Sequence, residues 1–129
     1  MKPAQEEEVA NFSELYQRLK KEKIQLEGKL EQLRAHEQAL SERREGSPYG
    51  KREEEADQAI ELEKRLALKR RLIDSLAAIE RALQKYESGT YGICDSCGQS
   101  IGHARLEALP QANLCLRCKA LQAKDARTR

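Results

Sequence analysis

The sequence predicts a mainly α-helical fold: a long antiparallel coiled-coil hairpin, a small four-cysteine module and a short C-terminal helix. Three observations point to this. Charged residues make up 36% of the 129-residue chain and aromatic residues only 4%, with no Trp and one Phe. This composition suits long solvated helices better than a large core. Leucines recur at a three-four spacing in two long segments separated by a Gly/Pro-rich break, and all four cysteines fall in two C-x-x-C pairs.

The first long helix is predicted to start at Asn11, because Glu14 follows three residues later in the manner of a capping box. One apolar stripe then continues along the segment, formed by Phe12, Leu15, Leu19, Leu26, Leu30, Leu33 and Leu40. Glu22 and Glu37 occupy stripe positions where a leucine is expected. The pattern is a heptad-like seam on a helix that ends near Arg44.

A tight reversal is predicted at residues 46–50, where two glycines flank a serine, a proline and a tyrosine. A second helix follows from about Lys51 to Ser88, and Gly89 stands at the position of a helix C-cap glycine. Its stripe consists of Leu72, Leu76, Ile79, Leu83 and Tyr86, with Leu62, Leu66 and Ile73 as an overlapping extension. Two such helices around a short loop pair as an antiparallel hairpin, with arms on the order of 50 Å long.

The predicted division of the chain is a flexible N-terminus (1–10), the hairpin (11–89, with its tip at 46–59), the cysteine module (90–118) and a C-terminal helix with a tail (119–129). The C-terminal helix is expected to reach Ala126, and its Leu121 to pack on the base of the hairpin.

The cysteine pairs Cys94/Cys97 and Cys115/Cys118 have the spacing of a four-thiolate zinc site. Four sulfurs complete a tetrahedral shell and leave no position for a water molecule, so the sequence predicts one structural Zn²⁺ and no catalytic metal. Gly98 follows the first pair, where such a turn often needs a positive φ. The alternative is two disulfides, which persist in oxidising compartments. The sequence begins with polar and acidic residues and no apolar signal segment. We therefore expect a cytoplasmic protein with reduced cysteines.

The module is expected to depend on the metal for its folding. Its apolar content is small, consisting of Ile93, Ile101, Leu106, Leu109, Leu114 and Leu116. A structural zinc ion supplies about 10–16 kcal/mol of apparent binding free energy to a unit of this kind.

Two charged clusters and one histidine allow alternative interpretations. Four carboxylates within residues 53–57 are either a solvated first helical turn or a group that the hairpin tip presents to a partner. The basic stretch of the second helix (Lys64, Arg65, Lys69, Arg70 and Arg71) is expected to pair with Glu22, Glu27 and Glu31 of the facing arm. His103 lies between the cysteine pairs, and we expect it to be a structural or surface residue because four sulfurs already fill the metal shell.

A nucleic-acid-binding zinc finger is a competing hypothesis, but the charge is weak. Residues 94–129 carry a net charge of +3, or about +1 once the thiolate–zinc cluster is counted. The whole chain has a net charge of +2, and no recognition helix is expected between the pairs. Sequence-specific DNA binding is therefore not expected. No apolar run reaches the roughly 18 residues that a membrane span needs, so no membrane association is expected.

Three segments around the cysteines resemble a known signature. They are Gly89-Thr90-Tyr91-Gly92-Ile93-Cys94, Arg105-Leu106-Glu107-Ala108-Leu109-Pro110 and Leu114-Cys115. Together they resemble the C4-type zinc finger of the DksA/TraR family of bacterial RNA polymerase regulators, and the likeness covers about residues 50–120.

The resemblance implies a partner and a mode of action. Family members bind RNA polymerase and insert the hairpin through its secondary channel, where they alter initiation, often together with ppGpp. The tip motif of the family is Asp-x-x-Asp-x-Ala, and the matching residues here are Glu54, Asp57 and Ala59. Glu54 keeps the charge of the first aspartate but has a longer reach.

The sequence therefore predicts a transcription regulator that is not an enzyme, since no nucleophile–base pair is visible and the metal shell is closed. A polymerase-channel factor of the Gre type, whose tip carboxylates hold a metal for transcript cleavage, is one alternative, and a cleavage assay on stalled complexes separates the two. Another is a zinc-stapled adaptor that binds a different protein along the hairpin.

Overall fold

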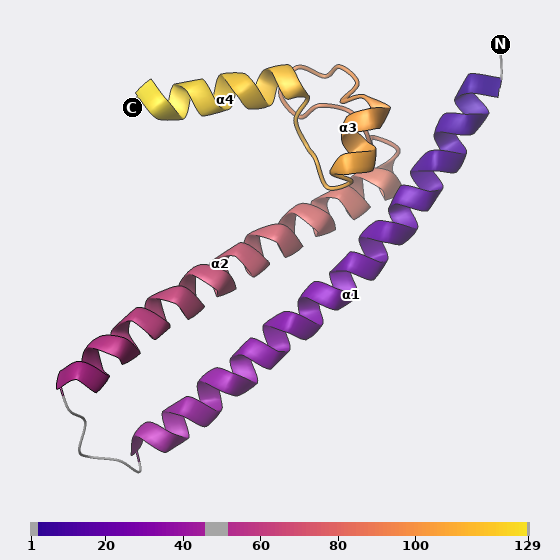
Figure 1. Cartoon of the computed structure of the whole chain (residues 1–129). Coiled ribbons are helices and arrows are strands. Elements are labelled where there is room, and N and C mark those ends of the chain that lie inside the picture. Colours follow the sequence, from indigo (N-terminus) through magenta and orange to yellow (C-terminus); the bar gives the residue numbers. More distant parts are fainter. Residues whose placement is uncertain (1–2, 46–51, 129) are drawn as a thin grey trace. The chain divides into compact units, whose positions relative to one another are not determined.

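The computed structural model describes the backbone of residues 3–45 and 52–128, and the side chains of residues 12–42 and 55–126. This part of the chain is mainly helical, as predicted (Figure 1). In chain order the helices are α1 (Pro3–Glu45), α2 (Arg52–Ser88), α3 (His103–Ala108) and α4 (Leu116–Thr128). The predicted reversal at residues 46–50 lies outside the described residues.

The chain forms two compact units: residues 1–23 with 77–129, and residues 24–76. α1 and α2 each contribute to both. We call the first the base unit and the second the arm unit.

In the base unit, α1 and α2 pair antiparallel around an apolar seam. Tyr16 stacks on Tyr86 with ring centroids 4.1 Å apart and an interplanar angle of 15°. Further along α1, the ammonium of Lys23 lies 3.9 Å from the carboxylate of Glu80, an earlier residue of α2. The seam between them buries Leu15, Leu19, Ile79 and Ala82, each with at most 3% of its surface exposed. The predicted stripes of both helices therefore meet here.

In the arm unit α1 and α2 also pair antiparallel, and fewer of its described side chains are fully buried. Leu30 is 6% exposed, and the Glu37 carboxylate accepts a hydrogen bond of 3.3 Å from Lys69 across the two helices. The extension of the α2 stripe is wrong: the three residues predicted to form it, Leu62, Leu66 and Ile73, are 38–45% exposed. Their stripe is rotated around the helix relative to seam residues such as Leu72 and Leu76, which are half-buried, so it faces α1 less directly.

The ends of the two long helices differ in how well they were predicted. α1 begins at Pro3, so the predicted start at Asn11 is wrong and Asn11 lies inside the helix. Proline at a first helical position, followed by acidic residues near the N-terminal end of the helix dipole, favours this earlier start. α2 ends as predicted. Gly89 has φ of 80°, and the N–H groups of Gly89 and Thr90 donate to the carbonyls of Tyr86 and Lys85, which is a Schellman cap.

The C-terminal helix α4 starts at Leu116, inside the second cysteine pair, earlier than the predicted Lys119. The prediction that Leu121 packs on the hairpin is wrong, because this side chain is 53% exposed and residues 119–126 are exposed throughout. Among the described residues, no helix is long and apolar enough to cross a bilayer.

Candidate metal centre

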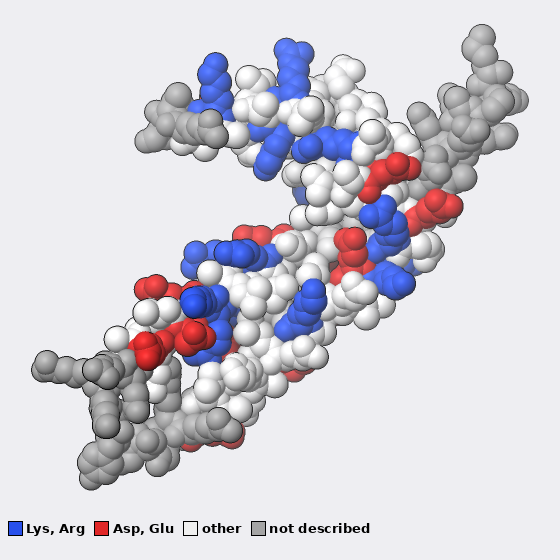
Figure 2. Space-filling model, viewed as in Figure 1, with Lys and Arg blue, Asp and Glu red and all other residues white. Residues whose placement is uncertain are grey.

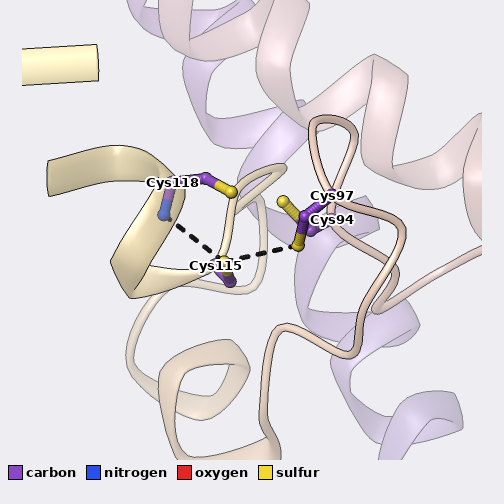
Figure 3. Close-up of side chains that lie close together, drawn as sticks. All are labelled: Cys94, Cys97, Cys115 and Cys118. Carbon is purple, nitrogen blue, oxygen red and sulfur yellow. Dashed lines mark hydrogen bonds between the residues drawn. The ribbon is translucent and has the colours of Figure 1, made fainter. Parts of the chain in front are cut away.

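The four cysteines come from two short segments of the base unit. Cys94 and Cys97 lie in the loop between α2 and α3, Cys115 precedes α4, and Cys118 lies in the first turn of α4. Their side chains point toward one another (Figure 3), and the four sulfurs all lie within 4.8 Å of one another. Cys94 and Cys118 are 2% and 9% exposed. The structure thus brings together all four residues that the sequence predicted.

The sulfur positions fit one tetrahedral metal ion. A tetrahedron with Zn–S distances of about 2.3 Å has sulfur–sulfur edges of about 3.8 Å, and the sulfurs of Cys97 and Cys115 are 3.8 Å apart. A disulfide instead requires about 2.05 Å between its sulfurs, and all four cysteines are free. The donor set is therefore that of a structural zinc site.

The two cysteine turns are built differently. Gly98 has φ of 73° and its N–H donates to the carbonyl of Cys94 at 3.1 Å, which confirms the positive φ predicted for this residue. In the second turn the Cys118 N–H points at the sulfur of Cys115 at 3.4 Å. There Lys119 continues into α4, donating to the Cys115 carbonyl at 2.9 Å, so no glycine is needed.

The pKa values of the thiols differ because each sulfur has different hydrogen-bond partners. The backbone N–H of Cys97 is the main cause that lowers the pKa of Cys94 to about 6, and the N–H of Cys118 likewise lowers the pKa of Cys115. The neighbouring sulfur of Cys115 is the main cause that raises the pKa of Cys118 to about 12. Four thiolates this close repel one another, so a cation is needed before all four ionise.

An ion-pair cluster connects the first cysteine turn to α2. The carboxylate of Asp95 lies 2.8 Å from the Arg81 guanidinium and 2.9 Å from the Lys85 ammonium. Burial works to raise the pKa of Asp95, but the hydrogen bonds from Lys85 and Arg81 outweigh it and hold the pKa below its usual value.

An aromatic cluster connects the module to α1. The Phe12 ring meets Tyr91 edge-to-face at 5.1 Å and lies 6.5 Å from the His103 ring. The hydroxyl of Tyr91 donates to the carbonyl of Pro110 at 2.9 Å, and burial raises the pKa of Tyr91 to about 12 against an opposing effect of Arg18. His103 also bonds to Glu107 at 2.9 Å, consistent with the predicted structural role.

The apolar core of the module is smaller than its composition suggests. Ile101 and Leu106 are 6% and 1% exposed, whereas Ile93, Leu109 and Leu116 are 41–71% exposed. Sequence reasoning missed Asp95 and Phe12 as anchors of the module. Phe12 is the only phenylalanine and lies on the seam stripe, which could have singled it out; the x positions of a C-x-x-C pair give no such signal.

The predicted tip residues belong to the arm unit. Asp57 and Ala59 are exposed on α2, and the side chain of Glu54 lies outside the described residues. The predicted pairing of the basic stretch with Glu22, Glu27 and Glu31 is wrong for Lys69, which pairs with Glu37, and for Lys64, which pairs with Glu61 of its own helix at 3.9 Å. Opposite charges mix over the hairpin surface in view (Figure 2).

Comparison with known proteins defines the class of the metal centre. Residues 89–122 match the prokaryotic dksA/traR C4-type zinc finger. The RNA polymerase-binding transcription factor DksA of Escherichia coli K12 is 42% identical over 74 residues, which is 57% of this chain and 46% of that protein. The DksA of Haemophilus influenzae is 51% identical over 43 residues, 33% of this chain and 30% of that protein.

The fold agrees with this classification. The structure of transcription factor DksA2 from Pseudomonas aeruginosa matches with a TM-score of 0.73 and 26% identity, over 92% of this chain and 87% of that one. Residues 89–122 are thus similar to the dksA/traR C4-type zinc finger, and this finger provides the donor set for one structural zinc ion. The sequence match spans less than half the length of the E. coli relative.

Proposed function

We propose that this chain is a cytoplasmic transcription regulator without enzymatic activity, which binds RNA polymerase and acts through the hairpin. The hairpin enters the secondary channel of the polymerase, and the tip modulates initiation together with ppGpp. The observation that carries the proposal is the combination of a dksA/traR finger with a helical hairpin, matched over 92% of the chain by a DksA2 structure. The relatives from E. coli and H. influenzae are described as RNA polymerase-binding transcription factors.

In this proposal the finger has a structural role. Cys94, Cys97, Cys115 and Cys118 hold the zinc ion, because their sulfurs are the only group of three or more metal-binding side chains in the described part of the chain. A closed shell of four thiolates offers no site for an activated water molecule. The zinc therefore stabilises the base unit and takes no part in chemistry.

The active surface of the proposed regulator is the tip, formed by Glu54, Asp57 and Ala59. The exposure of Asp57 and Ala59 leaves them accessible to a partner. A carboxylate that meets the catalytic region of the polymerase acts by favouring one polymerase conformation over another. It need not contribute much affinity, since a partly exposed charge is worth roughly 0–1 kcal/mol.

The test measures binding to RNA polymerase and the effect on open-complex lifetime separately. Each variant is titrated against RNA polymerase, and open-complex decay at a ribosomal-type promoter is measured with and without ppGpp. Asp57→Asn is nearly isosteric and is expected to leave affinity within a few-fold while largely abolishing the change in open-complex lifetime. Glu54→Ala is expected to do the same more weakly. Asp74→Asn is the matched control, because Asp74 is an exposed aspartate in the middle of α2.

Two results contradict the proposal at different levels. A parent chain that does not bind polymerase refutes the proposed partner. An Asp57→Asn variant that equals the parent in both assays shows that the carboxylate cluster is only a solvated helix start.

A further inference from the structure

Asp95 lies inside the first cysteine pair, yet its side chain contacts α2. Its Oδ2 accepts a hydrogen bond from Arg81 Nε at 2.9 Å, and its Oδ1 accepts one from Lys85 Nζ at 2.9 Å. Lys85 also donates to the carbonyl of Ile93, so it contacts the chain on both sides of Cys94. The side chains of Lys85 and Asp95 are only 13% and 24% exposed, and solvent screens such a pair less than a surface pair.

The backbone of the same turn is bonded to the rest of the module. The N–H of Asp95 donates to the carbonyl of Asn113 at 2.9 Å, just before the second cysteine pair, and the N–H of Cys94 donates to Gln99 at 2.8 Å. Asp95 therefore joins three parts of the base unit: α2, the first cysteine turn and the segment that leads to the second.

We propose that Arg81 and Lys85 are positioning residues of the zinc site, and that they act through Asp95 to hold Cys94 and Cys97 ready for the metal. The affinity for zinc then depends on helix α2, which contributes no ligand. The inference rests on the proposed four-cysteine ligand set and is independent of polymerase binding. Groups that orient ligands from outside the ligand shell typically change metal affinity 10–100-fold when removed.

The positive charges of Arg81 and Lys85 also contribute to zinc affinity, in addition to their positioning role. Arg81, Lys85 and Cys94 line one open groove of about 580 Å³ along the end of α2. A zinc ion with four thiolates carries a net charge of about −2. Arg81 and Lys85 carry two positive charges and Asp95 carries one negative charge, so together they place a net charge of +1 near this anion.

The charge contribution and the positioning contribution predict opposite changes in zinc affinity for one variant. Asp95→Asn removes a negative charge close to the thiolates, so charge alone predicts equal or tighter zinc binding. Positioning predicts weaker binding, because Cys94 and Cys97 must then be ordered when the metal binds. Asp95→Asn is therefore the decisive variant.

The experiment is a zinc competition titration of the full chain against a chromophoric chelator, with circular dichroism of the zinc-saturated protein to confirm equal helix content. Asp95→Asn is expected to weaken zinc binding about tenfold or more, and Asp95→Glu to restore most of it. Arg81→Gln is expected to have the smaller effect of the two cation variants, because its side chain is 58% exposed against 13% for Lys85. Lys64→Gln removes the same charge from α2 at a residue that pairs with Glu61, and is expected to bind zinc like the parent.

A double variant tests whether the residues act as one unit. Asp95→Asn combined with Lys85→Gln is expected to lose little more than Asp95→Asn alone. Zinc binding by Asp95→Asn within twofold of the parent, equal loss in Lys64→Gln, or full additivity in the double variant each overturn the proposal. A parent chain that binds no zinc refutes the ligand set instead, so the two failures are distinguishable.

Discussion

Gly92 packs against the Phe12 side chain of α1, and the effect of a single added methyl group at this residue tests how tightly the two pack. Gly92 has φ of 85°, and a Cβ there would lie 3.1 Å from Phe12 Cζ and 3.4 Å from Leu106 Cδ1. Leu106 is 1% exposed, and the Phe12 ring is already in edge-to-face contact with Tyr91.

The expected cost of Gly92→Ala has two parts. An L-residue in the left-handed region costs roughly 1–2 kcal/mol, and an extra methyl group in a filled contact adds about 1–3 kcal/mol. Gly89→Ala is the matched control, because Gly89 has φ of 80° but nothing within 4 Å of the added Cβ. It should lose only the roughly 1–2 kcal/mol of backbone strain. The difference between the two variants is then the packing contribution, at least about 1 kcal/mol.

The measurement is urea unfolding at saturating zinc, so that metal binding stabilises every variant equally. Tyrosine fluorescence reports mainly on the base unit, because three of the four tyrosines, Tyr16, Tyr86 and Tyr91, lie in it. Adding Phe12→Leu shortens the side chain that the new methyl group meets, and should recover part of the loss beyond the sum of the single variants. A Gly92→Ala variant no less stable than Gly89→Ala would refute the packing of Phe12 and Leu106 on this glycine.

Three further predictions concern the metal, the buried tyrosine and the hairpin. Protein purified without added metal should contain one zinc per chain, and Cys115→Ser should unfold residues 90–120 while retaining most of the helical circular dichroism, because α1 and α2 have their own seam; a folded, metal-free parent contradicts this. The pKa of Tyr91 is raised to about 12, so its neutral form stabilises the fold fully below pH 10, and about 2–3 kcal/mol is lost as the pH rises from 10 to 12. Tyr91→Phe should flatten that part of the pH–stability curve, and an unchanged curve means that Tyr91 is not its source. Spin labels at Leu15 and Leu83 should report a short distance, whereas a separation on the order of 100 Å, expected of one continuous rod, excludes the hairpin.

Helix content and the metal centre could be predicted because their signals are local and periodic. Apolar spacing marks a helical stripe, and a glycine just after the stripe marks a helix end. Each C-x-x-C pair places two metal ligands within four residues. The predicted C-cap at Gly89 and the turn at Gly98 were confirmed for this reason.

The wrong predictions concern which of two apolar stripes on one helix packs against the neighbouring helix. Leu62, Leu66 and Ile73 have seam-like spacing but are exposed, because a neighbouring stripe of α2 supplies the seam. Leu121 of α4 is likewise exposed, although the sequence predicted that it packs. Spacing alone cannot decide between two overlapping apolar stripes on one helix. The partners in ion pairs were harder to predict, because a long flexible side chain can reach several opposite charges. Lys69 pairs with Glu37, one of several carboxylates on α1.

The two units are stabilised by different interactions, and the four cysteines of the metal centre lie in the base unit. In the arm unit the contacts across the hairpin include apolar burial at Leu30 and the Glu37–Lys69 pair, neither of which involves a cysteine. In the base unit, Phe12 and Tyr91 connect the module to α1, and Asp95 connects it to α2. Each connection starts within a few residues of Cys94. A change at the metal centre therefore acts on the pairing of α1 with α2 in the base unit.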